Sequence, residues 1–368
     1  MKQVIISGGG TGGHIFPALA IADALKARFP SIDIFFIGAK NRMEMERVPK
    51  AGYPIEGLDI VGIQRRLTLR NLQVPVKLWK SYRRASQIIA EKKPDIVIGV
   101  GGYASAPTLL AAIRAGVPTL IQEQNSYAGL TNRWLGKYAQ KICVAYPDME
   151  AFFPAEKIVY TGNPVRQDIL RLPPRTEALQ ALGLKDGAPV LLVMGGSLGA
   201  RVINESIQAQ IRRFADNRIQ VIWQTGKHFI EKARQAVEEQ QASEWVHPMA
   251  FIERMDHAYS AADLIISRAG ALSISELCIV GKPAILVPSP YVAEDHQTKN
   301  AMALVHRQAA KIISEAQAPA FLVSDALALL HSPAERALLS ENIRRLARPK
   351  ATEHIVQCII QLAHGGAS

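Results

Sequence analysis

The stretch Val4-Ile5-Ile6-Ser7-Gly8-Gly9-Gly10-Thr11-Gly12-Gly13-His14 lies near the start of the chain and carries the strongest fold signal. Its apolar run is typical of a buried strand, and its glycines predict a tight turn. A helical pattern over residues 15–29 follows directly. A strand, a glycine-rich turn and a helix in this order predict a parallel α/β unit, in which ligands bind beyond the carboxyl ends of the strands.

Short apolar runs alternate with helical patterns along the whole chain, and they form two series. Predicted strands of the first series cover residues 3–7, 32–37, 96–100, 119–121 and 141–144, and those of the second cover 189–194, 220–223, 264–267, 283–287 and 311–313. The patterns over 200–214 and 297–307 predict helices of the second series, residues 161–175 predict a linker, and a helical tail with a break at Arg348-Pro349 follows Pro333. Because parallel strands need helical crossovers, we expect two Rossmann-like halves.

The bulk composition is that of a globular chain with an anionic partner. Hydrophobic residues make up 48% of the 368 residues and charged residues 20%, which suits two packed domains. The formal net charge is +11, and residues 62–93 hold nine basic residues against one acidic residue, Glu91. The three cysteines have neither zinc-site nor redox-motif spacing and predict no disulfide framework.

No segment is predicted to cross a membrane. The best apolar stretch, residues 107–121, is interrupted by Arg114, Gly116 and Pro118, whereas a spanning helix needs about 20 apolar residues. The chain runs from Met1 into a strand without the apolar core of a signal peptide, so we expect a cytosolic protein whose membrane contact is peripheral.

Four glycine-rich turns follow predicted strands, two in each half, at residues 7–14, 99–105, 195–200 and 267–273. Gly8 to Gly13 has the glycine spacing of a dinucleotide-binding fingerprint, but the second strand ends at Ala39-Lys40 without the acid that the fingerprint requires. A nicotinamide cofactor is therefore disfavoured. The turns either bind polar or phosphorylated ligands or only allow close packing of strand and helix.

The ordered set of motifs resembles a known family. The motifs are Gly9-Gly10-Thr11-Gly12-Gly13-His14, Gly99-Val100-Gly101-Gly102-Tyr103, Glu123-Gln124-Asn125, Gly162-Asn163-Pro164-Val165-Arg166, Gly195-Gly196-Ser197-Leu198-Gly199-Ala200, Gly270-Ala271-Leu272-Ser273-Ile274-Ser275-Glu276 and Asp295-His296-Gln297-Thr298-Lys299-Asn300-Ala301. They resemble the N-acetylglucosaminyltransferases that complete the lipid-linked disaccharide precursor of peptidoglycan. Leu198 departs from the glutamine usual in that loop.

The resemblance implies an α/β protein of the GT-B fold, with two Rossmann-like domains facing across a cleft and a C-terminal helix returning to the first domain. Residues 1–163 would bind the acceptor and the membrane, residues 164–345 would bind UDP-GlcNAc, and residues 346–368 would form the returning helix. The implied reaction transfers N-acetylglucosamine, with inversion and without metal or cofactor, to the 4-hydroxyl of the muramoyl sugar on undecaprenyl pyrophosphate. Implied partners are the anionic cytoplasmic face of the inner membrane and a cell-wall synthesis complex, but no nucleic acid.

Site residues follow from the resemblance, position by position. His14, at the start of a helix whose dipole favours a neutral ring, is the predicted base, with substrate binding as its alternative role. Predicted donor-binding residues are Arg166, Ser197, Ile252, Ala271, Leu272, Ser273, Glu276 and Gln297, and predicted acceptor-binding residues are Thr11, Gly12, Gly13 and Asn125.

Several of these residues also have a purely structural interpretation. Ser273-Ile274-Ser275-Glu276 has the pattern of a capping box, in which Glu276 would only cap a helix. Asn125 could stabilise its own loop, Ile252 could be a core side chain, and Arg166 could be an ordinary surface arginine.

The basic stretch predicts a membrane-binding patch made of Leu72, Val76, Lys77, Trp79, Lys80, Arg83 and Arg84. Apolar side chains would enter the headgroup boundary while lysines and arginines bind anionic lipid. A solvated basic helix is the alternative. Nucleic acid is disfavoured because the chain has no recognised binding module and few interleaved aromatic residues.

Three other functions stay open at this stage. The chain could be a glycosyltransferase of the same fold acting on another lipid, a UDP-sugar epimerase, or a catalytically silent protein that binds a UDP-sugar. An epimerase needs no acceptor, and a silent binding protein would release no UDP.

Overall fold

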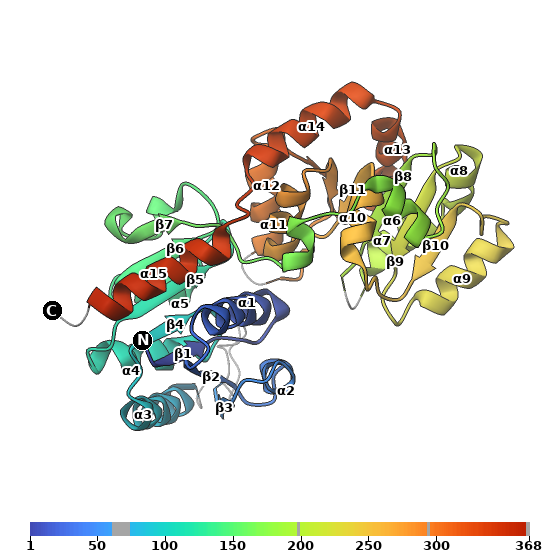
Figure 1. Cartoon of the computed structure of the whole chain (residues 1–368). Helices are drawn as coiled ribbons and strands as arrows, with labels where there is room; N and C mark the ends of the chain where they lie inside the picture. The colour runs from blue at the N-terminus through green and yellow to red at the C-terminus, as the bar shows by residue number, and fades with distance from the viewer. Residues whose placement is uncertain (61–73, 197–198, 293–294, 366–368) are drawn as a thin grey trace. The chain divides into compact units, whose positions relative to one another are not determined.

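The computed structural model describes residues 1–60, 74–196, 199–292 and 295–365. The chain divides into two compact units: unit 1 comprises Met1–Val165 and Pro349–Ser368, and unit 2 comprises Arg166–Arg348. Each unit contains a parallel sheet with helices packed against it, so the α/β fold expected from the alternating pattern is confirmed (Figure 1).

Unit 1 is built on a seven-stranded parallel sheet with the order β3-β2-β1-β4-β5-β6-β7. Its strands are β1 (Gln3–Ser7), β2 (Asp33–Ala39), β3 (Ile55–Leu58), β4 (Ile96–Gly99), β5 (Thr119–Glu123), β6 (Lys141–Val144) and β7 (Ile158–Tyr160). Its helices are α1 (Gly12–Arg28), α2 (Glu44–Lys50), α3 (Val74–Lys92), α4 (Ser105–Arg114), α5 (Leu130–Gly136) and α15 (Ala351–Gly365), with short 3-10 helices at Met149–Ala151 and Ala155–Lys157. The strand order reverses between β1 and β4, which makes this pair the topological switch point.

The C-terminal helix α15 completes the core of unit 1. Ile355, Val356 and Ile359 are buried in the same cluster as Ile6 on β1 and Ile21 on α1. Figure 1 shows α15 lying over the strands of unit 1 at the end of the chain. The returning helix expected from the resemblance is therefore present.

Unit 2 contains a six-stranded parallel sheet with the order β10-β9-β8-β11-β12-β13. Its strands are β8 (Val190–Met194), β9 (Gln220–Gln224), β10 (Val246–Met249), β11 (Leu264–Ser267), β12 (Ala284–Leu286) and β13 (Lys311–Ile312). Its helices are α6 (Arg175–Ala181), α7 (Arg201–Gln208), α8 (Ile211–Asp216), α9 (Ile230–Glu239), α10 (Met255–Ala261), α11 (Ala271–Val280), α12 (His296–Val305), α13 (Ala318–Leu330) and α14 (Pro333–Arg345), with a 3-10 helix at Gln167–Leu170. The switch point lies between β8 and β11.

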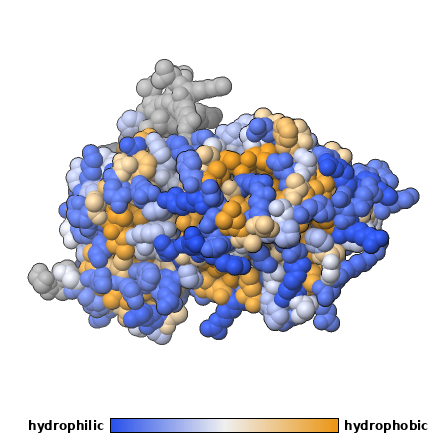
Figure 2. All heavy atoms as spheres, turned by 90° about the horizontal axis from the view of Figure 1, so that it is seen from above, coloured by the Kyte–Doolittle hydropathy of each residue, from blue (hydrophilic) through white to orange (hydrophobic). Residues whose placement is uncertain are grey.

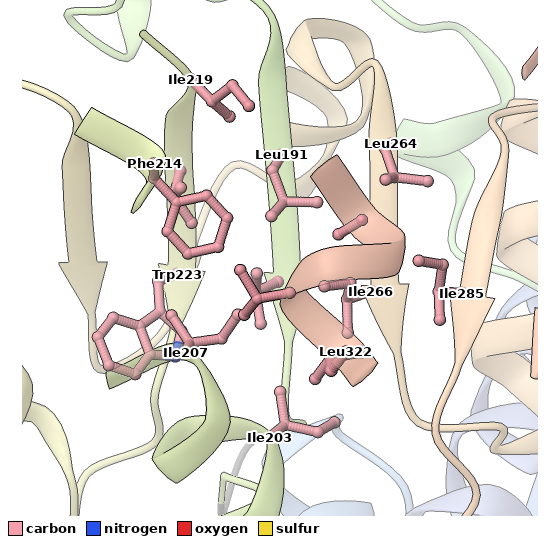
Figure 3. Close-up of a cluster of buried hydrophobic side chains, with 14 of the residues drawn as sticks. Leu191, Ile203, Ile207, Phe214, Ile219, Trp223, Leu264, Ile266, Ile285 and Leu322 are labelled. Carbon is pink, nitrogen blue, oxygen red and sulfur yellow. The ribbon is translucent and has the colours of Figure 1, made fainter. Parts of the chain in front are cut away.

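One face of the unit 2 sheet packs on helices through a large apolar cluster (Figure 3). Trp223 on β9 and Phe214 on α8 are both fully buried there. The Trp223 indole N–H donates to the Asn204 side chain at 3.0 Å, which satisfies its polar group inside the cluster. The cluster includes Leu191 on β8 and Ile266 on β11, the two strands that flank the switch point.

Two predicted helices differ from the structure in informative ways. The helix expected over residues 200–214 is broken into α7 and α8 at Gln210, whose φ of −132° is not helical. The Gln240 side chain accepts from the Arg212 N–H and donates to the Gln208 carbonyl on the two sides of this break. Helix α1 starts at Gly12 rather than after His14, so Gly12, Gly13 and His14 form its first turn.

The face drawn in Figure 2 mixes hydrophilic and hydrophobic residues, and the hydrophobic ones gather in several areas between the hydrophilic ones. Among the described residues, no helix is both long enough and apolar enough to span a bilayer. Helix α3 nevertheless exposes three large apolar side chains, those of Val76, Leu78 and Trp79.

Candidate active site

Each unit presents its own set of loops at the switch point of its sheet. In unit 1 these loops follow β1 and β4, and in unit 2 they follow β8 and β11. Ligands of parallel α/β sheets bind in this position, because the loops there separate to opposite faces of the sheet. Among the predicted substrate residues that the structure describes, all but Arg166 and Glu276 belong to loops or helix starts at the carboxyl edge of one sheet or the other.

His14 is held in the first turn of α1 by the loop that precedes it. Its Nδ1 lies 3.0 Å from the Gly9 carbonyl oxygen and 3.3 Å from the Thr11 hydroxyl. Gly101, which has a φ of +91°, packs so closely against the ring that a Cβ there would lie 2.9 Å from His14 Nε2. Thr11, Gly12, Gly13 and His14 are thus brought together beside the β4 loop, as a shared role requires.

A buried carboxylate that the sequence patterns did not single out closes this glycine turn. Glu44, at the start of α2, is 1% exposed, and its Oε2 accepts from the Gly10 N–H at 2.8 Å. Its Oε1 accepts from the Ala39 N–H at 3.0 Å. Glu44 therefore links the end of β2 to the glycine turn through two backbone N–H groups.

The loop after β5 is organised by a second buried carboxylate, Glu123. It accepts from the Asn132 side chain at 2.8 Å and from the Asn125 N–H at 3.1 Å, and the Asn125 side chain also donates to it at 3.3 Å. Burial raises the pKa of Glu123 despite these donors. The Asn125 side chain thus bonds the Glu123 carboxylate within this loop, and acceptor binding by Asn125 stays a prediction.

In unit 2, the loop after β8 needs its glycines for close packing. Gly196 and Gly199 have positive φ values of +81° and +79°. A Cβ at Gly199 would lie 2.2 Å from the Thr225 carbonyl oxygen, so only glycine fits there. Ser197, predicted to bind the donor, and Leu198, the departure from the family pattern, lie outside the described residues.

Helix α11 begins at Ala271, with Gly270 as an extended N-cap residue. Ala271, Leu272 and Ser273 are its first three residues, whose N–H groups have no carbonyl one turn earlier to bind. The capping-box interpretation of Ser273 to Glu276 is wrong, because the helix starts before Ser273 and Glu276 lies in its second turn. The helix start instead forms an anion-binding geometry of backbone amides.

Glu276 is held by one donor on each carboxylate oxygen. The Arg166 Nε donates to Oε1 at 3.0 Å, and the Tyr259 hydroxyl donates to Oε2 at 2.8 Å. Tyr259 is 1% exposed, and burial together with the Glu276 charge raises its pKa well above the usual value. Arg166 is therefore more than an ordinary surface arginine, since it anchors the predicted ribose-binding carboxylate.

The remaining two predicted donor residues, Ile252 and Gln297, have structural roles of their own in unit 2. The Ile252 side chain is 2% exposed and belongs to the core, as its structural interpretation predicts. Gln297, in the first turn of α12, accepts from the Ser289 N–H at 2.8 Å and fixes the loop after β12. Contacts of either residue with a donor stay predictions.

The predicted membrane patch on α3 has two classes of cation. Lys77 binds Asp59 at 2.9 Å, and Arg84 binds Glu56 at 2.9 Å through Nη2, so these two charges are neutralised within unit 1. By contrast, Lys80 is exposed and the Arg83 guanidinium lies 4.9 Å from the centre of the Trp79 ring. The patch is thus less charged than the sequence suggests; Leu72 lies outside the described residues.

One exposed face of α3 combines apolar and basic side chains. Val76 and Trp79 are 54% and 56% exposed, and helical spacing places them on the same face as Lys80 and Arg83.

Across the described parts of the chain, no group of three or more His, Cys, Asp and Glu residues is arranged to hold a metal ion.

Comparisons with known proteins agree over the whole chain. The glycosyltransferase family 28 N-terminal domain matches residues 4–144, and its C-terminal domain matches residues 190–357. A relative from Porphyromonas gingivalis is 56% identical over 98% of this chain and 95% of its own length, and one from Flavobacterium psychrophilum is 49% identical over 100% and 99%. Both are named UDP-N-acetylglucosamine–N-acetylmuramyl-(pentapeptide) pyrophosphoryl-undecaprenol N-acetylglucosamine transferase.

Solved structures give the same result. The crystal structure of Acinetobacter baumannii MurG matches with a TM-score of 0.82 and 33% identity, covering 98% of this chain and 100% of that one. A UDP-GlcNAc 2-epimerase from Neisseria meningitidis matches with a TM-score of 0.65 and 15% identity over 98% and 100% of the two chains, which indicates a shared fold alone. This chain therefore belongs to glycosyltransferase family 28 and, within it, to the MurG family of UDP-N-acetylglucosamine–N-acetylmuramyl-(pentapeptide) pyrophosphoryl-undecaprenol N-acetylglucosamine transferases.

Proposed function

We propose that this chain transfers N-acetylglucosamine from UDP-GlcNAc to the 4-hydroxyl of the muramoyl sugar in undecaprenyl-pyrophosphoryl-N-acetylmuramyl-pentapeptide. The names of relatives that are 49% to 56% identical over nearly the full chain support this substrate pair. Within the molecule, the proposal depends most on one observation, which is the way Glu276 is held in unit 2.

The Glu276 carboxylate suits a ribose. A carboxylate offers about four acceptor positions, and Arg166 and Tyr259 each use one, on different oxygens. The positions left match the two neighbouring hydroxyls of a ribose. The amides of Ala271, Leu272 and Ser273 start the same helix and supply donors for the diphosphate of the same nucleotide.

The chemistry that follows is a single displacement. The acceptor oxygen forms a bond to the anomeric carbon while the bond from that carbon to the UDP phosphate oxygen breaks, which inverts the configuration. His14 takes the proton of the acceptor hydroxyl, and the α11 amides and Arg166 stabilise the charge that develops on UDP. Thr11, Gly12, Gly13 and Asn125 line the acceptor side of unit 1.

Membrane contact is assigned to the exposed face of α3. Val76 and Trp79 would enter the headgroup boundary, and Lys80 and Arg83 would bind anionic lipid at about 1 kcal/mol each. An acceptor with a polyprenyl chain stays in the bilayer, so this contact would bring unit 1 to its substrate at the cytoplasmic face of the membrane.

The direct test is to incubate the chain with UDP-GlcNAc and the lipid-linked muramoyl acceptor in the presence of a chelator. UDP release and a product heavier by one N-acetylhexosamine are expected. Conversion of UDP-GlcNAc without acceptor would identify an epimerase instead, and UDP binding without any release would identify a silent binding protein. A product made only from another lipid acceptor would refute the proposed substrate.

A further inference from the structure

One peptide group in unit 1 is hydrogen-bonded at both ends by functional side chains. The peptide that joins Gly9 to Gly10 donates its N–H to Glu44 Oε2 at 2.8 Å. The carbonyl of the same peptide, on Gly9, lies 3.0 Å from His14 Nδ1. Glu44, the peptide and His14 thus form one continuous chain of hydrogen bonds.

The contact with Gly9 determines which ring nitrogen of His14 carries the proton. A carbonyl oxygen only accepts hydrogen bonds, so Nδ1 must donate. In a neutral ring Nε2 is then the basic nitrogen, which is the form that a proton acceptor requires. The ring is also fixed in orientation, because Gly101 packs against its Nε2 side.

We propose that Glu44 is a positioning residue for His14, acting through the Gly9–Gly10 peptide. Its negative charge polarises this peptide, which strengthens the acceptor at the Gly9 carbonyl and stabilises the positive charge that the ring gains when it takes a proton. The arrangement resembles the carboxylate of a catalytic triad, except that a peptide group stands between the carboxylate and the imidazole. The inference extends the proposed function, since it assumes that His14 is the base.

The surrounding backbone is built for this contact. Glu44 is 1% exposed and uses both oxygens on backbone N–H groups, those of Gly10 and Ala39. A Cβ at Gly9 would lie 2.2 Å from the Glu44 carboxyl carbon, and one at Gly102 would lie 2.3 Å from the Gly9 carbonyl oxygen. Because both positions are glycine, the Glu44 carboxylate and Gly102 of the loop after β4 can both pack against the Gly9–Gly10 peptide.

A second carboxylate faces this corner from another element. Glu123, at the end of β5, accepts from the Asn132 side chain, whose nitrogen would lie 3.8 Å from a Cβ at Gly101. Within the described parts of the chain, Glu123 binds Asn125, Gly129 and Asn132 and makes no hydrogen bond to the Gly9–Gly10 peptide. Glu44 is therefore the carboxylate that is connected to His14 Nδ1 through the Gly9–Gly10 peptide.

The first experiment measures the tautomer directly in the unmodified protein. The chain is labelled with ¹⁵N-histidine, and the His14 ring signals are identified by their loss in a His14→Gln variant. We expect the neutral His14 ring to show a protonated Nδ1 and an unprotonated Nε2. A ring protonated on Nε2 would overturn the proposal, and this result needs no variant of Glu44 and no turnover.

The second experiment compares Glu44→Gln with Glu46→Gln, a matched change on the exposed side of the same helix, where Glu46 binds Lys50. We expect Glu44→Gln to lower kcat about tenfold, as loss of a carboxylate behind a functional histidine does, with KM for both substrates unchanged and a mixed His14 tautomer. Glu46→Gln should match the wild type. Unchanged kcat and tautomer in a folded Glu44→Gln protein would contradict the proposal.

The same measurements separate this inference from the proposed function. If His14→Ala kept full turnover, His14 would not be the base and the proposed role of Glu44 in catalysis would fall with it, whatever the tautomer. If His14→Ala lost turnover while Glu44→Gln did not, the base would stand and only the role of Glu44 would be refuted.

Discussion

The two switch points share one geometry but use their carboxylates in opposite ways. In unit 1, Glu44 accepts from the backbone of the glycine turn itself, so one amide of that turn is already bonded. In unit 2, Glu276 accepts from the side chains of Arg166 and Tyr259, while the first amides of α11 have no protein acceptor among the described residues. The two units therefore differ in what the carboxylate holds: Glu44 fixes the glycine turn of unit 1, whereas Glu276 is itself fixed by two side chains of unit 2.

The largest effect expected from this comparison is on chemistry in unit 1. His14→Ala should reduce kcat by about 10²- to 10⁴-fold, because it removes the group that accepts the hydroxyl proton. Affinity for UDP, measured by calorimetry, should not change, since the nucleotide is assigned to unit 2. Turnover near the wild-type rate at saturating substrates would break the assignment of the base.

The next effect is on nucleotide binding in unit 2. Glu276→Ala should weaken UDP binding about 10²-fold, because hydrogen bonds to a charged group contribute about 1.5–3 kcal/mol each. Calorimetry with UDP and with 2′-deoxy-UDP sharpens the test. The wild type should discriminate against the deoxy nucleotide and the variant should not; equal discrimination by both proteins would remove ribose recognition from Glu276.

A smaller effect is expected on membrane binding through α3 of unit 1. Lys80→Gln together with Arg83→Gln should reduce partition onto anionic liposomes roughly 30-fold, at about 1 kcal/mol per cation, and leave UDP affinity unchanged. The matched pair Lys77→Gln and Arg84→Gln should lose less, since those cations are bound to Asp59 and Glu56. Equal losses from both pairs would mean that ion pairing on α3 does not determine lipid binding.

The smallest expected effect concerns the support of Glu276. Tyr259→Phe should weaken UDP binding about fivefold, because it removes a hydrogen bond worth about 1 kcal/mol from Glu276 Oε2. The raised pKa of Tyr259 keeps its hydroxyl protonated from neutral to alkaline pH, so the loss should be the same across that range. Tyr291→Phe, at an 85% exposed tyrosine, is the control. A loss that disappears at alkaline pH would argue against a neutral donor.

The sequence predicts buried strands better than strands at the edges. The bounds of β1, β6 and β11 agree with the predicted residues, because central parallel strands are buried on both faces and read as continuous apolar runs. The strands β3, β7 and β10, which the patterns did not predict, all lie at sheet edges. Edge strands tolerate polar residues and even proline, as Pro248 in β10 illustrates.

The site is predictable only where its residues lie within one motif. His14 and the start of α11 follow from local glycine patterns. By contrast, Glu44 on α2 binds the glycine turn that precedes α1, and Tyr259 on α10 donates to Glu276 on α11. The capping box predicted over Ser273 to Glu276 is wrong because the sequence pattern does not show where α11 starts. Gly270, an extended residue with no side chain, starts the helix earlier than the serine-to-glutamate spacing suggests.

The claim that the nucleotide belongs to unit 2 is tested most directly by a crystal structure of the chain with UDP. The account predicts ribose hydroxyls within hydrogen-bonding distance of Glu276 and the diphosphate against the amides of Ala271 to Ser273. Density for UDP against the Gly9–Gly10 turn of unit 1, with Glu276 bound only to Arg166 and Tyr259, would contradict it.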